Sequence, residues 1–192
     1  MLNALLAAEW SAPVIDYHAI APEMVLAGGL VLLLLLDLFL SDAKKWVLTP
    51  VASFTLLGAF IPVLTVALGT EGARSMFDGR YVVDDFSLVL KALFLLAGYV
   101  VVLISADHIR EGNYYEGEYW FLLLTSILGM VMMASSRDLV SIFVALEFLS
   151  IPAYMLAAWR KRDPKSNEAG IKYYLLGVFA SAVMLYLSLI HI

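Results

Sequence analysis

The sequence predicts an all-α fold, a polytopic transmembrane bundle of about six helices with the N-terminus outside the membrane. Composition is the first observation: 62% of the 192 residues are hydrophobic and 15% are charged, whereas soluble domains average about 45–50% apolar and about 25% charged residues. Segment length is the second, because about 20 consecutive apolar residues cross a bilayer and such segments recur along the whole chain. The third is the placement of Lys and Arg between them, which predicts the orientation.

Six apolar segments are predicted to cross the membrane, without a soluble domain between them. In chain order they are Pro22–Leu40, Trp46–Leu68, Phe86–Ser105, Tyr119–Ser135, Leu139–Trp159 and a last segment that begins near Ala169. Residues 1–21 precede them and contain no Lys or Arg, so they lack the basic region of a secretory signal. We expect residues 1–21 to form a lead-in at the outer membrane surface.

The connections between these segments differ in positive charge. The first, third and fifth connections hold seven of the Lys and Arg residues, and the second and fourth hold three. Cytoplasmic connections are enriched in Lys and Arg, so the odd-numbered connections are predicted to be cytoplasmic. Trp46, Trp120 and Trp159 then fall at the cytoplasmic ends of segments, where an interfacial aromatic belt is expected.

Glu147 is the strongest candidate for chemistry, because it lies in the middle of the apolar segment Leu139–Trp159. A charged side chain at the bilayer centre costs about 2.5–3.5 kcal/mol on insertion scales, so such a group is usually functional. Ser150 and Tyr154 share its helix face and could hydrogen-bond the carboxyl group, and Pro152 loosens the helix nearby. These four residues predict a proton path. The alternative is a structural glutamate that hydrogen-bonds a neighbouring helix.

Two lysines also lie within apolar segments. Lys172, near the start of the last segment, is expected either to extend to the interface or to reach Glu147 through water, and we include it in the proton path. Lys91 lies early in the third segment, and we expect it to extend outward toward Asp84 and Asp85.

Two acidic residues of the first segment are expected to be structural. Asp37 is predicted to face Lys44 or Lys45 at the interface, and Glu23 suits the positive end of the helix dipole. The chain contains no cysteine, and its three histidines lack metal-ligand spacing, so we expect no metal, disulfide or iron–sulfur site. No phosphate-binding loop, nucleophile elbow or nucleotide fingerprint occurs.

Several motifs together resemble one family. They are SIFVALEFLSIPAYMLAAWRKRDPKSNEAGIKYYLLGVFASAVMLY, the first segment PEMVLAGGLVLLLLLDLF, and the DDFS entry to the third segment. With them the chain resembles, over nearly its whole length, the antiporter-like membrane subunits of bacterial NADH–quinone oxidoreductase (complex I), most of all the N-subunit type. The resemblance implies a multi-pass protein of the bacterial inner membrane that takes part in proton translocation coupled to quinone reduction.

The resemblance also implies roles for individual residues. Glu147 matches a key glutamate of the family's proton path, and Lys172 matches a secondary polar residue. The family carries no cofactor in this subunit: NADH, flavin, iron–sulfur clusters and quinone are handled by other subunits of the complex. The implied partners are other complex I membrane subunits and the lipid bilayer, not nucleic acid.

Two other functions stay open at this point. A subunit of a multisubunit sodium/proton antiporter is similar in ancestry, and gene neighbourhood would separate it from a respiratory subunit. A passive membrane scaffold would tolerate any small polar residue at Glu147. We also expect residues 22–186 to form the transmembrane part and residues 187–192, LSLIHI, to be a read-through or artefactual tail, because one frame of a common sequencing adaptor encodes the same residues.

Overall fold

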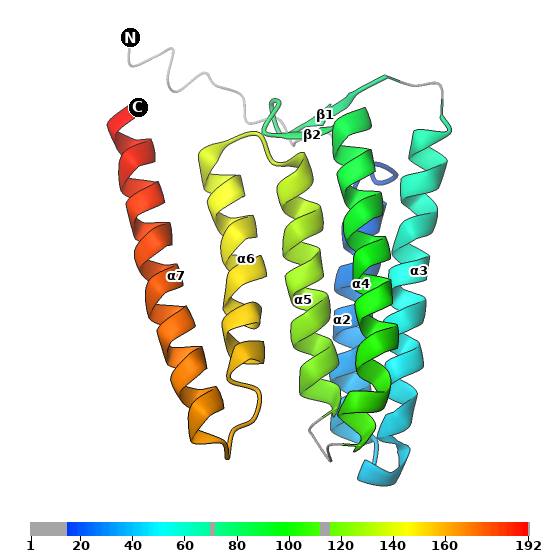
Figure 1. Cartoon of the computed structure of the whole chain (residues 1–192). Coiled ribbons are helices and arrows are strands. Elements are labelled where there is room, and N and C mark those ends of the chain that lie inside the picture. Colours follow the sequence, from blue (N-terminus) through cyan, green and yellow to red (C-terminus); the bar gives the residue numbers. More distant parts are fainter. Residues whose placement is uncertain (1–14, 70–71, 112–115, 192) are drawn as a thin grey trace, which may run out of the picture.

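The structure is a computed structural model that describes residues 15–69, 72–111 and 116–191. Within these ranges, six helices are long and apolar enough to cross a membrane. They are α2 (Ala21–Phe39), α3 (Leu48–Ala67), α4 (Asp85–Glu111), α5 (Glu116–Ser135), α6 (Leu139–Ala157) and α7 (Pro164–His191). They run up and down side by side, with α2 to α5 grouped together and α6 and α7 extending to one side (Figure 1).

The prediction of six membrane helices is confirmed, with shifted boundaries. The third predicted segment ended at Ser105, but α4 continues through a polar stretch to Glu111. The last was predicted from Ala169, but α7 begins at Pro164. Both differences have the same cause: a helix ends where its backbone is capped, which need not coincide with the edge of its apolar stretch. Proline favours the first turn, where its missing N–H is not needed.

A β-hairpin connects α3 to α4, and sequence analysis treated this stretch as a plain loop. Strands β1 (Arg74–Met76) and β2 (Tyr81–Val83) pair antiparallel. The turn between them places Phe77, Asp78 and Gly79 at φ of 53°, 56° and 83°. Three-residue strands leave no alternating pattern to detect, and left-handed conformations are uncommon for residues other than glycine.

The hairpin also contacts the turn between α5 and α6. Tyr81 forms an isolated antiparallel bridge with Ser136, and the backbone N–H of Arg137 donates to the carbonyl of Arg80 at 2.8 Å. The Arg137 guanidinium also forms an ion pair with Asp84, at the end of the hairpin. The hairpin therefore joins the start of α4 to the α5–α6 turn at one end of the bundle (Figure 1).

The buried core lies among α2, α3, α4 and α5. Of the residues in the apolar stretch of each helix, 44% are buried in α5, 17% in α6 and 11% in α7. Helices α6 and α7 therefore have the most exposed faces.

Trp120 belongs to the buried core and is 0% exposed. Its predicted place in a lipid-facing belt is therefore wrong, because the start of α5 packs inside the bundle. Trp46 is 58% exposed.

Helices α2 and α3 approach closely at Gly29. A Cβ atom built on Gly29 would lie 2.1 Å from Cγ2 of Thr55, whereas one built on Gly28 would meet nothing within 4 Å. Thr55 is β-branched and its hydroxyl donates to the carbonyl of Val51 at 2.8 Å, so it cannot move aside easily.

We therefore expect Gly29→Ala to lower stability by about 1–3 kcal/mol, as overpacked cores do. Gly28→Ala is the matched control and should change little. Thermal unfolding in detergent, followed by circular dichroism, measures both. Equal midpoints for the two variants would contradict the close α2–α3 contact.

Orientation in the membrane stays a prediction, and the cysteine-free chain makes it simple to test. Asp78 in the hairpin turn and Lys165 at the start of α7 are both exposed and lie at opposite ends of the bundle. In intact cells a membrane-impermeant maleimide should label Asp78→Cys, and it should label Lys165→Cys only after permeabilisation. The reverse pattern would place the N-terminus inside.

Candidate functional site

Helix α6 carries Glu147 and begins at a well-formed cap. The Asp138 carboxylate accepts hydrogen bonds from the backbone N–H groups of Val140 at 2.9 Å and Ser141 at 3.1 Å. The Ser141 hydroxyl donates to the same carboxylate, and this bond, together with the backbone bonds, lowers the pKa of Asp138. The cap satisfies donors that would otherwise lack partners at the first turn, and it fixes where α6 starts.

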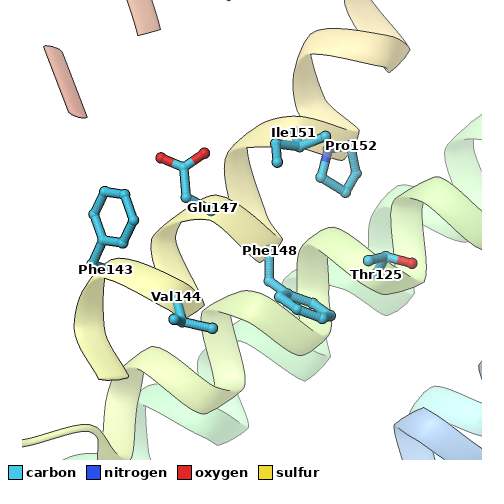
Figure 2. Close-up of a pocket in the computed structure, with 7 residues that line it drawn as sticks. All are labelled: Thr125, Phe143, Val144, Glu147, Phe148, Ile151 and Pro152. Atoms are coloured by element: carbon cyan, nitrogen blue, oxygen red, sulfur yellow. The ribbon is translucent and has the colours of Figure 1, made fainter. Parts of the chain in front are cut away.

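The Glu147 side chain lines a groove of about 350 Å³ at the side of the bundle. The other lining residues are Thr125 from α5 and five residues of α6: Phe143, Val144, Phe148, Ile151 and Pro152. In Figure 2 the Glu147 carboxyl group points away from α5, whereas Phe148 and Thr125 lie on the α5 side. Among the described residues, Glu147 has neither a hydrogen-bond nor an ion-pair partner. The groove is thus mostly apolar, with one unpaired carboxyl group at its edge.

Helix α5 supports α6 directly behind Glu147. A Cβ atom on Gly129 would lie 2.5 Å from the backbone nitrogen of Leu149, so only glycine permits this approach. The Ser126 hydroxyl donates to the carbonyl of Leu149 at 3.0 Å. Pro152 removes the backbone donor for the carbonyl of Phe148, one residue earlier. The Ser126 bond therefore joins α5 to the turn that Pro152 loosens, and the sequence did not predict this contact.

The supporting residues predicted around Glu147 do not all approach it. Tyr154 is 7% exposed and packs edge to face on Tyr173 and Tyr174 of α7, at ring-centroid distances of 4.7 and 5.8 Å. Its hydroxyl would meet any side chain built on Gly177. Ser150 is half-buried and makes no described hydrogen bond to Glu147. The roles of Ser150 and Tyr154 in a proton path stay predictions.

Lys172 lies on an exposed part of α7, and the structure does not bring it to Glu147. Its ammonium group forms an ion pair with Glu168, one turn earlier on the same helix, and its side chain is 69% exposed. This arrangement fits the interfacial alternative. A water-mediated link to Glu147 stays a prediction.

The structure reveals a second charged cluster, which we name the Glu23 cluster: Glu23, Tyr81 and Lys91. Lys91 was predicted to extend toward Asp84 and Asp85, and this prediction is wrong. Its side chain is 0% exposed, and Nζ lies 2.8 Å from Oε1 of Glu23 in α2. Asp84 instead pairs with Arg137.

Tyr81 completes this cluster from the hairpin. Its hydroxyl donates to Oε1 of Glu23 at 2.5 Å, and Nζ of Lys91 lies 3.4 Å from that hydroxyl and 5.3 Å from the ring centroid. Burial and the Glu23 carboxylate raise the pKa of the Tyr81 phenol, so it stays a donor. One signal was present in the sequence: Glu23 and Lys91 both lie early in segments that start at the same face. Nothing in the sequence placed α2 beside α4.

Asp37 of α2 forms an ion pair with Lys45 at 3.4 Å, which confirms the predicted contact with Lys44 or Lys45. In the described ranges no group of three or more His, Asp or Glu side chains is placed to hold a metal ion.

The buried Glu23–Lys91 pair makes a prediction about stability. Lys91→Met leaves Glu23 as a lone buried charge, and breaking such a pair costs about 3–5 kcal/mol. The double variant Glu23→Gln/Lys91→Met should recover most of that loss, because no lone charge remains. Lys172→Met, which removes an exposed lysine, is the control and should change little. If Lys91→Met melts at the wild-type temperature in detergent, the pair is not buried as described.

Comparisons with known proteins link this geometry to a family. Residues 136–191, which include Glu147 and Lys172, match a family model described as NADH:quinone oxidoreductase/Mrp antiporter, TM. NADH-quinone oxidoreductase subunit N of Moorella thermoacetica is 38% identical over 177 residues, which cover 92% of this chain and 36% of that protein. NAD(P)H-quinone oxidoreductase subunit 2 of Synechococcus elongatus is 38% identical over 167 residues, covering 87% and 32%.

Solved structures show the same arrangement of helices. A chain of respiratory complex I from Thermus thermophilus with bound aureothin superposes with a TM-score of 0.70 at 33% identity, over 86% of this chain and 35% of that one. A chain of the archaeal membrane-bound sulfane sulfur reductase gives 0.67 at 18% identity, over 89% and 36%, which shows likeness of fold alone. The chain thus spans about a third of the length of the relatives it matches.

Proposed function

We propose that the chain belongs to the antiporter-like membrane subunit family of NADH–quinone oxidoreductase and that it takes part in proton translocation coupled to quinone reduction. It acts in this proposal as a multi-pass component of the bacterial inner membrane. The observation that carries the proposal is Glu147, a carboxyl group in the middle of a membrane-length helix with no partner among the described residues.

The position of Glu147 supports a role in proton exchange rather than a structural role. A structural glutamate in a bilayer needs donors from a neighbouring helix, because a charge there is costly without them. The α5 donor nearest to this turn, Ser126, is used on the carbonyl of Leu149 instead. A carboxyl group free of such bonds can gain and lose a proton when a nearby charge or water molecule changes.

The open face of α6 and α7 supports the same proposal. Only 17% of the residues in the apolar stretch of α6 and 11% of those in α7 are buried. The chain covers about a third of the length of its relatives. We infer that in the longer relatives further helices cover this face and bring polar groups or water to Glu147. The groove beside Pro152 is the place where they would meet it.

The mechanism follows from charge and position. Glu147 alternates between a neutral and an ionised form, water reaches it near Pro152, and Ser150 and Tyr154 orient that water. Lys172 provides a positive charge toward the other end of the path. Moving one charge across the full membrane potential is worth about 2.3 kcal/mol per 100 mV, so modest changes in local charge suffice to move the proton.

The partners in this proposal are other complex I membrane subunits and the surrounding lipid. NADH, flavin, iron–sulfur clusters and quinone belong to other subunits, and electron transfer there drives the protonation changes here. In this proposal residues 22–186 form the transmembrane part.

A subunit of a multisubunit sodium/proton antiporter is the second candidate, because the matched family description joins both kinds of complex. Both functions use Glu147 as a proton site. They differ in the energy source: a respiratory subunit works with quinone reduction, and an antiporter works with a sodium gradient.

Glu147→Gln tests the proposal in membranes of the source organism. The amide cannot release a proton, so we expect NADH-driven proton pumping to fall on the order of tenfold or more, as when a proton-transfer group is removed. Pumping is measured with a pH-sensitive dye, and assembly of the complex by native gel electrophoresis.

Glu118→Gln is the matched control, because Glu118 is an exposed carboxylate paired with Lys161 outside the groove. It should leave pumping unchanged. Normal pumping in Glu147→Gln would reject the proton role and favour a passive scaffold. Loss of sodium-driven rather than NADH-driven proton movement would favour the antiporter.

A further inference from the structure

A pocket separate from the Glu147 groove lies at the end of the bundle opposite the hairpin, where α4 and α6 end and α5 and α7 begin (Figure 1). We propose that this pocket binds the phosphate headgroup of an anionic phospholipid from the leaflet at that end. Its volume is about 270 Å³, several times the ~30 Å³ that one water molecule takes up in the liquid, so a phosphodiester group has room in it. The inference does not rest on the proposed role of Glu147.

The charge of the pocket fits an anion. His108 of α4 and Arg160, which follows α6, line it and are both exposed. Among the described residues that line the pocket, none is acidic. Residues 158–167, which include Arg160, hold four basic residues and one acidic residue. Glu118 neutralises one of the four, Lys161, through an ion pair at 2.7 Å, and a net positive charge remains beside the pocket. Because a guanidinium group binds phosphate through two parallel hydrogen bonds, Arg160 is suited to the headgroup.

The elements that form the pocket are held together by hydrogen bonds and close packing. The Ser166 hydroxyl of α7 donates to the carbonyl of Ala157 at 3.1 Å and accepts from the backbone N–H of Arg160 at 3.3 Å. A Cβ atom on Gly170 would lie 2.4 Å from Cβ of Ala158, so α7 packs directly on this connection. The backbone of Arg160 is therefore fixed, and little of the chain has to be ordered when a ligand binds.

The other lining residues are typical of the boundary between lipid and water. Tyr119 and Trp159 pack edge to face at a ring-centroid distance of 5.6 Å, and the Tyr119 hydroxyl donates to Ser105 of α4 at 2.9 Å. Ile109 and Leu156 add apolar side chains. Tyrosine and tryptophan are enriched at the level of the lipid headgroups. A phospholipid matches the whole site, because its phosphate suits the basic rim and its acyl chains suit the exposed apolar surface of α6, whereas a soluble anion matches the rim alone.

The pocket also lies at the end of the bundle where anionic lipid is expected. The sequence predicts that this end is cytoplasmic, and basic pockets between transmembrane helices on that side bind anionic headgroups. Four helices contribute to the site, so a lipid in it binds the folded bundle and not the unfolded chain. Its binding should therefore raise the midpoint of thermal unfolding.

Lipid binding to the purified 192-residue chain in detergent tests this inference, with native mass spectrometry as the readout. We expect one molecule of dioleoyl phosphatidylglycerol to bind on the order of tenfold more tightly than dioleoyl phosphatidylcholine, because its headgroup carries a net negative charge. Arg160→Gln should remove most of this preference. Arg162→Gln is the matched control, because it removes the same charge from the same connection at an exposed residue that does not line the pocket, and it should keep the preference.

Ala157→Leu keeps every charge and fills the pocket, so it should also weaken the binding of phosphatidylglycerol, and it serves if circular dichroism shows that Arg160→Gln does not fold. Inorganic phosphate separates the lipid from a soluble anion. We expect phosphatidylglycerol to raise the unfolding midpoint and phosphate at the same concentration to leave it unchanged. Equal binding of the two lipids by the wild type, equal losses in Arg160→Gln and Arg162→Gln, or an equal effect of phosphate would overturn the proposal.

Discussion

The rest of the bundle depends on the requirement that a charge inside a membrane protein find its partner within the protein. Glu23 and Lys91 satisfy this requirement, because Oε1 of Glu23 on α2 lies 2.8 Å from Nζ of Lys91 on α4. The bilayer offers no competing water, so moving either helix would strand a charge at high cost. Tyr81 adds the hairpin to the same contact, because its hydroxyl donates to the carboxylate. One ion pair therefore holds α2 to α4 and to the hairpin that precedes α4.

That arrangement extends to the helix that carries Glu147. The strand that supplies Tyr81 bridges to Ser136, and Arg137 binds the hairpin through its backbone and its side chain. Asp138, the next residue, caps α6. A continuous series of contacts thus leads from the buried ion pair to the first turn of α6. Farther along, Gly129 and Ser126 hold α6 against α5.

Glu23 and Glu147 differ in their surroundings. The Glu23 cluster is enclosed on all described sides, with its own cation beside it. Glu147 lies at the edge of a mostly apolar groove on the open face of α6, without a cation nearby in the described residues. The part of each relative that this chain matches is about a third of that relative's length.

The membrane class, the six helices and the central place of Glu147 could be predicted from the order of residues alone, because the length of an apolar segment and a charge within it are local properties. The order of residues also predicted that Asp37 faces Lys44 or Lys45 across one short connection, and Lys45 is the partner in the structure. The packing of the helices, in contrast, turns Lys91 inward to Glu23, buries Trp120 and places Tyr154 against α7. Each of these depends on which helices are neighbours. Apolar segments that are hydrophobic all round do not encode that choice in their periodicity, and close contacts and buried polar pairs decide it.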